Sequence, residues 1–330
     1  MKRFLLIGSV TLLFMAGCQK SDAPAAEDRV EEEVALDGAG LRECGAHDVL
    51  LLKLQEDPGL GERMDQIERF TQEYARNPQA FRLVGDVLEV PVHVNVLYKT
   101  SAENVSLAQI QSQIDVLNQD FAATNSDYGL TPPIFQGVRS GDIKIKFIWA
   151  GEANVTRKST NKRSWNLNDD MKRSTRGGIN PTNPTTTLNI WVCNLSSGYL
   201  GYAQFPGGSS STDGIVIDNN AFGKGNYPLY TQFNLGRTAT HEVGHYFNLR
   251  HIWGDQTCGS DQVGDTPTHN TSNGGCPSYP HLSTCSGTPV EMTMNYMDYT
   301  NDVCMYMFTA GQAVRMQATY AMGGPRASLR

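Results

Sequence analysis

Residues 241–251 read His-Glu-Val-Gly-His-Tyr-Phe-Asn-Leu-Arg-His and contain three of the seven histidines in the 330-residue chain. On a helix, His241 and His245 lie four positions apart and project from the same face. Two imidazoles in this arrangement can bind one zinc ion at about 2.0–2.1 Å each. Glu242 then lies beside the metal, and His251 adds a third nitrogen if the chain turns sharply after the helix. Three protein ligands and one open position are typical of a catalytic zinc site.

A histidine pair at this spacing also occurs on ordinary amphipathic helices, where both rings merely satisfy hydrogen bonds. The third histidine argues against that reading, and so does a second segment, residues 295–299, which reads Asn-Tyr-Met-Asp-Tyr. A lone methionine such as Met297 most often fills a gap in the core. A tight turn with methionine downstream of a three-histidine motif, however, is the second half of the metzincin pattern. We therefore expect one zinc ion bound by His241, His245 and His251, with Met297 below it.

The similarity extends beyond the zinc motif. The chain closely resembles the pappalysin family of metzincin peptidases in residues 241–253, 265–267, 295–299, 304 and 308–316, and also in residues 200–206 and 213–217. The resemblance covers most of the chain from about residue 80 to 320. One position departs from the family pattern, because Asn248 replaces the usual glycine. The chain must turn there with a positive φ, which asparagine tolerates better than any residue except glycine.

The resemblance implies an α+β fold of the metzincin type. A twisted mixed β-sheet and long helices should form the N-terminal half, and a loop-rich, disulfide-stapled region the C-terminal half. The family suggests the pairs Cys258–Cys285 and Cys276–Cys304, although four cysteines by themselves allow three pairings. A zinc knuckle is the alternative, which the lack of a Cys-x-x-Cys spacing disfavours. Cys193 lies in an apolar strand pattern and is expected to be a buried thiol.

Two residues receive catalytic roles from the resemblance. Glu242 would take a proton from the water that attacks the scissile carbonyl and pass it to the leaving amine. Tyr299 matches a family tyrosine that hydrogen-bonds the developing oxyanion. The alternative for Tyr299 is a core tyrosine whose hydroxyl reaches the rim of the site.

Cys44 lies well before the zinc motif, in the stretch Arg-Glu-Cys-Gly at residues 42–45. A thiolate is a strong zinc ligand and could occupy the open fourth position. The surroundings resemble the cysteine-switch segment of zymogens in this family, whereas a free cysteine in a mobile segment is the alternative. Self-cleavage would then release the segment, and Arg63, Arg76 and Arg82 mark candidate positions.

The expected substrate is a protein or peptide that lies extended across the cleft. An edge strand can pair with its main chain, and residues 201–204 are our candidate for that strand. The pocket after the scissile bond is expected to involve residues 301–304. Some relatives carry an acid immediately before the position of Cys304 and prefer basic residues. Here Val303 takes that place with Asp302 next to it, so a basic preference stays open.

An oxygen-rich loop follows the zinc motif. Calcium binds six to eight oxygen ligands, and the family often binds calcium in this loop. We carry that role over to Asp261 and Thr266. The alternative is a turn that is held by hydrogen bonds to the aspartate side chain.

The first eighteen residues read as a bacterial lipoprotein signal. Lys2 and Arg3 precede an apolar stretch that is too short to cross a bilayer as a helix, and Met-Ala-Gly-Cys at residues 15–18 resembles a lipobox. Cleavage before Cys18 with lipid attachment would give an exported, lipid-anchored protein, and an ordinary signal-peptidase site would give a secreted one. We expect residues 19–75 to form an acidic linker and pro-segment, and residues 76–330 the catalytic domain.

Composition excludes other classes of protein. Charged residues make up 18% and hydrophobic residues 39% of the chain, which suits a folded, soluble domain. The net charge is −7, with seven acids and one arginine in residues 21–40. The sequence contains no basic stripe of the kind that would indicate nucleic-acid binding. We expect a monomer whose only membrane contact is the lipid on Cys18.

Periodicity predicts the following elements. Helices are expected at residues 61–75, 107–121 and 309–320, with Thr309 and Gln312 in capping-box spacing, and a zinc helix starting near Asn234 as a cap. Strands are expected at residues 87–98, 141–150, 187–193 and 214–218. Residues 252–308 show little regular pattern.

The main prediction is a zinc-dependent endopeptidase made as a zymogen. The alternative is a surface binding protein that kept the metzincin frame and lost turnover, and a third reading is a hydrolase of small peptides or amides. The presence of Glu242 and Tyr299 disfavours an inactive protein, because a protein without turnover has no need of the base.

Overall fold

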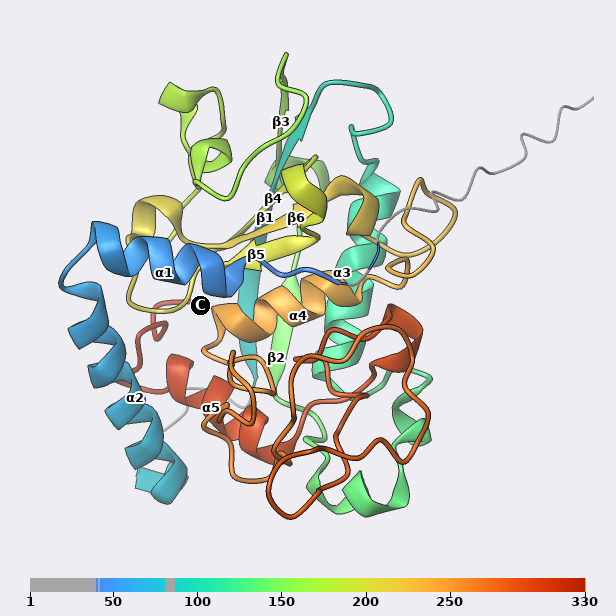
Figure 1. The fold of residues 1–330 in the computed structure, drawn as a ribbon. Helices are drawn as coiled ribbons and strands as arrows, with labels where there is room; N and C mark the ends of the chain where they lie inside the picture. The colour runs from blue at the N-terminus through green and yellow to red at the C-terminus, as the bar shows by residue number, and fades with distance from the viewer. Residues whose placement is uncertain (1–39, 41, 81–86, 330) are drawn as a thin grey trace, which may run out of the picture. The chain divides into compact units, whose positions relative to one another are not determined.

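A six-stranded β-sheet forms the centre of the described structure (Figure 1). This computed structural model describes residues 40, 42–80 and 87–329, so the predicted signal peptide and most of the acidic linker lie outside the described residues. The strands follow the order β2-β1-β4-β6-β5, and β3 also pairs with β1. Their bounds are Leu88–Tyr98 (β1), Ile145–Ile148 (β2), Val155–Ser159 (β3), Leu188–Cys193 (β4), Gly201–Ala203 (β5) and Ile215–Asp218 (β6).

The sheet is mixed because β5 alone runs antiparallel to its neighbour, β6, while the other pairs are parallel. Strand β5 ends the strand order, so its outer edge can accept another chain, as predicted for residues 201–204. Strand β3 was not predicted, and β2 is shorter than the expected 141–150. Strand β3 reads Val-Thr-Arg-Lys-Ser and carries little apolar alternation.

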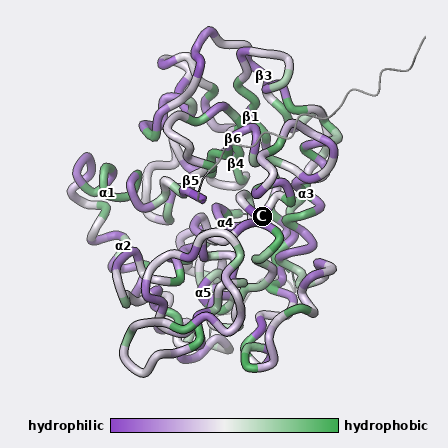
Figure 2. The backbone as a smooth tube through the Cα atoms, turned by 45° about the vertical axis from the view of Figure 1, so that its right-hand side comes forward, coloured by the Kyte–Doolittle hydropathy of each residue, from purple (hydrophilic) through white to green (hydrophobic). Residues whose placement is uncertain are grey.

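Alternation along the strands separates two apolar layers. Ile190 and Val192 of β4 point into the larger core, whereas Trp191 and Cys193 point to the opposite face. Because both faces are covered, even polar residues of the central strands, such as His93 and Asn95 of β1, are buried, and green and purple segments mix in the sheet in Figure 2. Cys193 is a fully buried free thiol, as expected.

Helices α3 (Leu107–Phe121) and α4 (Arg237–Tyr246) contribute to the larger core. Ser106 caps α3, since its side chain accepts a hydrogen bond from the amide of Gln109. The predicted start of α4 near Asn234 was wrong. Gly236, with φ of 77°, breaks the helix there, and the Asp302 carboxylate accepts the amides of Leu235 (2.8 Å) and Arg237 (3.2 Å) in place of a local cap.

Two further helices precede the sheet in the chain, α1 (Ala46–Glu56) and α2 (Leu60–Arg76). Helix α2 agrees with the expected 61–75 and packs against α5 (Ala310–Tyr320) through Tyr74, Ala318 and Ala321. Helix α1 was not predicted, because Leu51 and Leu52 are exposed and leave no clear apolar stripe. None of the helices described here combines the length and hydropathy that a membrane span requires.

The C-terminal half is loop-rich, as the resemblance implied. Between α4 and α5, the described residues form only one short helical turn, Asp302–Cys304. Disulfides join Cys258 to Cys285 and Cys276 to Cys304, each with a Cα–Cα distance of 5.7 Å, which confirms the suggested pairing. The two disulfides close loops of 27 and 28 residues, and on a chain-entropy model each would add about 3–4 kcal/mol to the free energy of unfolding. Thr309 and Gln312 form the expected capping box at the start of α5.

Candidate metal centre

Three buried histidine rings converge on and just beyond α4. The Nε2 atom of His245 lies 3.1 Å from Nε2 of His241 and 3.1 Å from Nε2 of His251. The Sγ atom of Cys44 joins them, and all four ligand atoms lie within 4.8 Å of one another. Ligands at the corners of a zinc tetrahedron stand about 3.3–3.4 Å apart, given bonds of about 2.0–2.1 Å. The spacing of the nitrogens is therefore close to that of a zinc site.

The three Nε2 atoms cannot be joined to one another by hydrogen bonds. In each ring Nδ1 lies against an oxygen that can only accept, so Nδ1 carries the proton and Nε2 a lone pair. The acceptors are the Tyr296 carbonyl for His241 (2.7 Å), the Leu249 carbonyl for His245 (2.8 Å) and the Asp255 carboxylate for His251 (2.5 Å).

Three lone pairs that face one buried point repel each other unless a cation lies between them. Burial lowers the pKa of His245 to about 3 and that of His241 well below its usual range, so these rings stay neutral. Neutral imidazoles are the form that binds zinc. The cluster of three histidines and one cysteine fits a catalytic zinc ion.

Asn248 turns the chain so that His251 reaches the other two rings. Its φ of 71° is the positive value that the sequence predicts. The amide of Leu249 bonds the carbonyl of Gly244 at 2.9 Å, which closes the end of α4. Arg315 of α5 fixes the same turn, because its Nε donates to the Asn248 carbonyl at 3.1 Å.

Glu242 is fully buried, and this burial raises the pKa of its carboxyl to about 8. The Cys44 thiol lies 3.4 Å from Oε2 of Glu242, and burial together with Glu242 raises the pKa of that thiol. A bound cation would reverse this preference and favour the thiolate. Gly201 of β5 must be small, since an added Cβ would lie 3.0 Å from Cγ of Glu242. The edge strand therefore begins directly beside the predicted base.

Met297 lies under α4. A Cβ on Gly244 would come within 2.5 Å of the Met297 sulfur, so the helix and the methionine pack without a gap. The Met297 carbonyl accepts the amide of Ile252 at 3.1 Å, next to His251. The turn thus packs against α4 at Gly244, the residue next to His245.

Comparison with known proteins supports the same interpretation. Residues 180–321 match the family model described as pregnancy-associated plasma protein-A. The chain is 34% identical over 247 residues to an extracellular metalloprotease of Verticillium alfalfae, with 70% of this chain and 78% of the relative covered. An extracellular metalloprotease of Arthroderma benhamiae is 32% identical over 241 residues, which cover 71% and 78%. The chain belongs to the pappalysin family.

Solved structures agree with this membership. Mature mirolysin of Tannerella forsythia in complex with a cleaved peptide is 43% identical, with a TM-score of 0.71, and the match covers 74% of this pappalysin chain and 96% of the other. A promirolysin mutant from the same organism is 38% identical with a TM-score of 0.78, covering 87% and 97%. The fold is that of a metzincin, and this pappalysin is a metalloendopeptidase.

Tyr299 forms two hydrogen bonds with the backbone of Cys44 in this pappalysin. Its hydroxyl donates to the Cys44 carbonyl at 3.1 Å and accepts the Cys44 amide at 3.2 Å. The ring lies edge-on to His251, with centroids 4.9 Å apart, and Trp253 stacks on His251 and also contacts the Tyr299 ring, at 4.7 Å. Tyr299 thus reaches the metal centre, and its hydroxyl is engaged by the segment that carries Cys44.

That segment pairs with the edge strand of the pappalysin sheet. The amide of Gly45 bonds the carbonyl of Gly201 at 2.9 Å, and the amide of Leu200 bonds the carbonyl of Glu43 at 2.9 Å. Arg42 enters a buried pocket beyond the pairing. Its guanidinium donates to the Asp302 carboxylate at 2.5 Å. It also donates to Thr238 Oγ1 (3.0 Å) and to the Thr300 carbonyl (3.2 Å).

Sequence reasoning missed Asp255 as the partner of His251, and it missed the pairing of Arg42 with Asp302. Asp255 follows His251 by four residues, so the local sequence held a usable signal. Arg42 and Asp302 are 260 residues apart. Nothing in the local pattern could have joined them.

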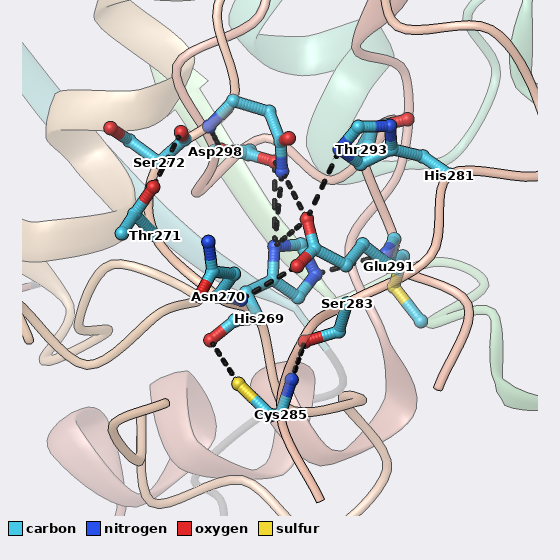
Figure 3. Close-up of polar contacts among 12 residues, drawn as sticks. His269, Asn270, Thr271, Ser272, His281, Ser283, Cys285, Glu291, Thr293 and Asp298 are labelled. Carbon is cyan, nitrogen blue, oxygen red and sulfur yellow. Dashed lines mark hydrogen bonds and ion pairs between the residues drawn. The ribbon is translucent and has the colours of Figure 1, made fainter. Parts of the chain in front are cut away.

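A buried polar network supports the pappalysin turn that carries Met297 and Tyr299 (Figure 3). One oxygen of Asp298 accepts the amides of Asn273 and Tyr299, both at 2.8 Å. The Asn273 side chain donates to Asp298 (3.0 Å) and Glu291 (2.7 Å), and His269 lies 3.5 Å from Asp298. These contacts fix the backbone of Tyr299 from the side away from Cys44.

Asp261 and Thr266, the candidate calcium ligands, lie next to each other. The Thr266 hydroxyl is 3.0 Å from each Asp261 oxygen, and the amide of Val263 bonds Asp261 at 3.1 Å. These bonds form the turn that the sequence offered as the alternative. Burial nevertheless raises the pKa of Asp261 to about 6. Asp265 caps α5 instead, by accepting from Gly311 at 2.7 Å and Thr309 at 2.6 Å.

Proposed function

We propose that this chain is an exported zymogen that matures into a zinc endopeptidase, with His241, His245 and His251 as metal ligands. The single observation that carries the proposal is the convergence of three proton-free Nε2 atoms beside buried Glu242. Residues 1–18 would be a signal peptide, residues 19–75 the linker and pro-segment, and residues 76–330 the catalytic domain. The substrate would lie extended along the edge of β5.

Zinc, when bound, would lower the pKa of a coordinated water towards about 7 and polarise the scissile carbonyl. Glu242 would take the proton from the attacking water, because its carboxylate faces the point where the three rings converge. The same carboxyl would then pass the proton to the nitrogen of the leaving amine. Burial raises the pKa of this carboxyl, which makes it a stronger base than an exposed glutamate, and a bound cation would keep it ionised.

Tyr299 would donate a hydrogen bond to the carbonyl oxygen as negative charge develops there. Its hydroxyl is within bonding distance of the Cys44 backbone, so it is free for substrate only after that segment leaves. Tyr299→Phe should lower kcat by about 10²-fold with little change in KM, because the bond strengthens in the transition state. Steady-state kinetics of the mature variant would test this, and an unchanged kcat would remove the role.

Cys44 would keep the zymogen latent as the fourth ligand of the metal. Cys44→Ala is expected to mature faster than the wild-type zymogen, because the fourth position of the metal is then open to water and the segment over the cleft is held less tightly. The lag before self-cleavage, followed by gel electrophoresis, measures the effect. Cys193→Ala is the matched control, since it removes the other free thiol, which lies in the core. Equal lags for Cys44→Ala and wild type would contradict the switch.

Asp302 would select a basic residue immediately after the scissile bond. The supporting observation is Arg42, whose guanidinium reaches the buried Asp302 carboxylate two residues from Cys44. Asp302→Asn keeps an acceptor for the amides of Leu235 and Arg237 and removes the charge. It should lower kcat/KM for a peptide with arginine at this position by about 10- to 100-fold. A matched peptide with leucine there is the control, and an equal loss for both peptides would refute the assignment.

Calcium binding and the lipid anchor are finer parts of the proposal. Asp261 offers a buried carboxylate of raised pKa, to which Thr266 and nearby carbonyls could add oxygens. Calcium should then raise the melting temperature of the mature enzyme, and an unchanged melting temperature would exclude calcium binding.

Intact-mass analysis of the N-terminus would show whether Cys18 carries lipid. Gel filtration would test the expected monomer.

The second candidate function is a binding protein of the same fold without turnover. The latent arrangement favours the enzyme, because a protein without turnover needs neither a thiol over the metal nor a carboxylate beside it. Self-processing distinguishes the two, since only an enzyme shortens its own chain and loses this ability in Glu242→Gln.

A further inference from the structure

Helix α1 makes a second buried ionic contact with the catalytic part of the chain, away from the metal centre. The Lys53 ammonium lies 3.0 Å from Oδ2 of Asp169. Asp169 is only 1% exposed, whereas the side chain of Lys53 is 21% exposed and approaches from outside. This carboxylate takes no part in the mechanism above.

Asp169 presents one oxygen to the interior and the other to Lys53. The inner oxygen, Oδ1, accepts the Tyr202 hydroxyl (3.0 Å) and pairs with the buried Lys172 ammonium (3.0 Å). The outer oxygen, Oδ2, is buried and faces the Lys53 ammonium, and no other hydrogen-bond partner is found for it among the described residues. Burial opposes the charge on Asp169, but Lys172 and Lys53 overcome it and hold its pKa to about 2.

The carboxylate lies beside the edge strand on which substrate would bind. Tyr202, which bonds Asp169, is the central residue of β5. Lys53 lines a small cavity together with Ala203 and Gln204, at the end of β5 away from the metal. Gly201, at the other end, is next to Glu242. At about 3.3–3.4 Å per strand residue, this cavity lies roughly two to four substrate residues from the scissile bond.

The direction follows from two ionic contacts of the N-terminal segment, one on each side of Cys44. Arg42 reaches Asp302 on one side of Cys44, and Lys53 reaches Asp169 after the chain has passed to the other side. If the Asp302 pocket receives the residue after the scissile bond, the Asp169 position receives one before it.

We propose that Asp169 forms a second specificity subsite, which binds a lysine or arginine side chain two to four residues before the scissile bond. This inference rests on the proposed peptidase function. When α1 leaves, Oδ2 of Asp169 loses the ammonium group that it faces. A cationic substrate side chain replaces that group and restores the pair, whereas an uncharged side chain leaves a partly buried oxygen without a partner.

Matched peptides test the subsite. Each peptide carries arginine immediately after the cleavage point. One position, the second, third or fourth before that point, is varied, and it carries lysine, norleucine or glutamate. Wild-type mature enzyme should cleave the best lysine peptide about five- to tenfold faster in kcat/KM than its norleucine counterpart. Asp169→Asn should reduce this ratio to about one. Asp170→Asn, the neighbouring carboxylate that faces Lys162 instead, should preserve it.

The outcomes separate the two proposals. Equal rates for lysine and norleucine in the wild-type enzyme would overturn the subsite, and so would a lysine preference that survives in Asp169→Asn. If the wild-type enzyme cleaves no peptide at all, the peptidase proposal fails first. The ratio within one enzyme also cancels any loss of folded protein in a variant.

A second measurement needs only the wild-type enzyme, in case Asp169→Asn does not fold. A synthetic peptide of residues 40–57 should inhibit mature enzyme, and Lys53→Gln in that peptide should weaken inhibition about five- to tenfold. Lys53→Gln is compatible with the helix, since glutamine and lysine have similar helix propensities. Equal inhibition by the two peptides would overturn the contact between Asp169 and a cationic side chain.

Discussion

Glu242→Gln is expected to remain full length when the zymogen is incubated with zinc, under conditions in which the wild-type chain shortens itself. Glutamine keeps the shape and burial of the side chain but cannot accept the proton of the attacking water. General-base catalysis of this kind contributes about 10²–10⁴-fold, so cleavage of a peptide substrate should fall by roughly 10³-fold. Gel electrophoresis with time and kcat/KM on one fluorogenic peptide provide the two readouts.

Glu89→Gln is the matched control, because Glu89 is exposed on β1 and pairs only loosely with Lys146, at 3.5 Å. It should process as fast as wild type. If Glu242→Gln shortens at the wild-type rate, Glu242 is not the base. A binding protein without turnover would give two negative results. The wild-type zymogen would not shorten itself, and the chain without residues 1–75 would not cleave any peptide.

Removal of the metal is expected to abolish cleavage completely, and stoichiometric zinc should restore it. The physical reason is the lone pair on Nε2 of each of His241, His245 and His251, which only a cation can satisfy at these distances. Elemental analysis of folded mature protein should find about one zinc per chain. His245→Gln should lose this zinc, whereas His93→Gln, on β1 and bonded to Thr156, should retain it.

A chelator that prefers calcium over zinc separates the two candidate ions, since it should lower stability but leave bound zinc in place. Proteolysis that persists in protein shown to be free of transition metal would contradict the whole assignment. Loss of activity together with loss of secondary structure would assign the ion a role in folding as well.

The positions of the metal ligands could be predicted from the sequence because they depend on local geometry. A helical repeat fixes His241 against His245, and one positive φ at Asn248 brings His251 to them. A period-two pattern likewise identified β1, and an apolar run identified β4, whose residues face the two cores alternately. The family resemblance, rather than spacing, supplied the disulfide pairs.

What the sequence could not provide depends on residues far apart in the chain. Helix α4 begins at Arg237 because the Asp302 carboxylate accepts amides there, so local propensity near Asn234 was misleading. Helix α1 carries exposed leucines and gains its stability from contacts with β5 and α2. The contacts of Arg42 and Lys53 with acids of the catalytic part have no local signature, although they indicate which substrates the cleft would accept.

Asp302 serves the scaffold and would also serve the proposed pocket after the scissile bond. One of its oxygens holds the start of the helix that carries His241 and His245, and the other meets the guanidinium of Arg42. If Asp302 determines selectivity, evolution and engineering cannot change it freely, since loss of this carboxylate would also loosen the metal-bearing helix. Retargeting the enzyme to acidic side chains would first require a substitute acceptor for the amides of Leu235 and Arg237.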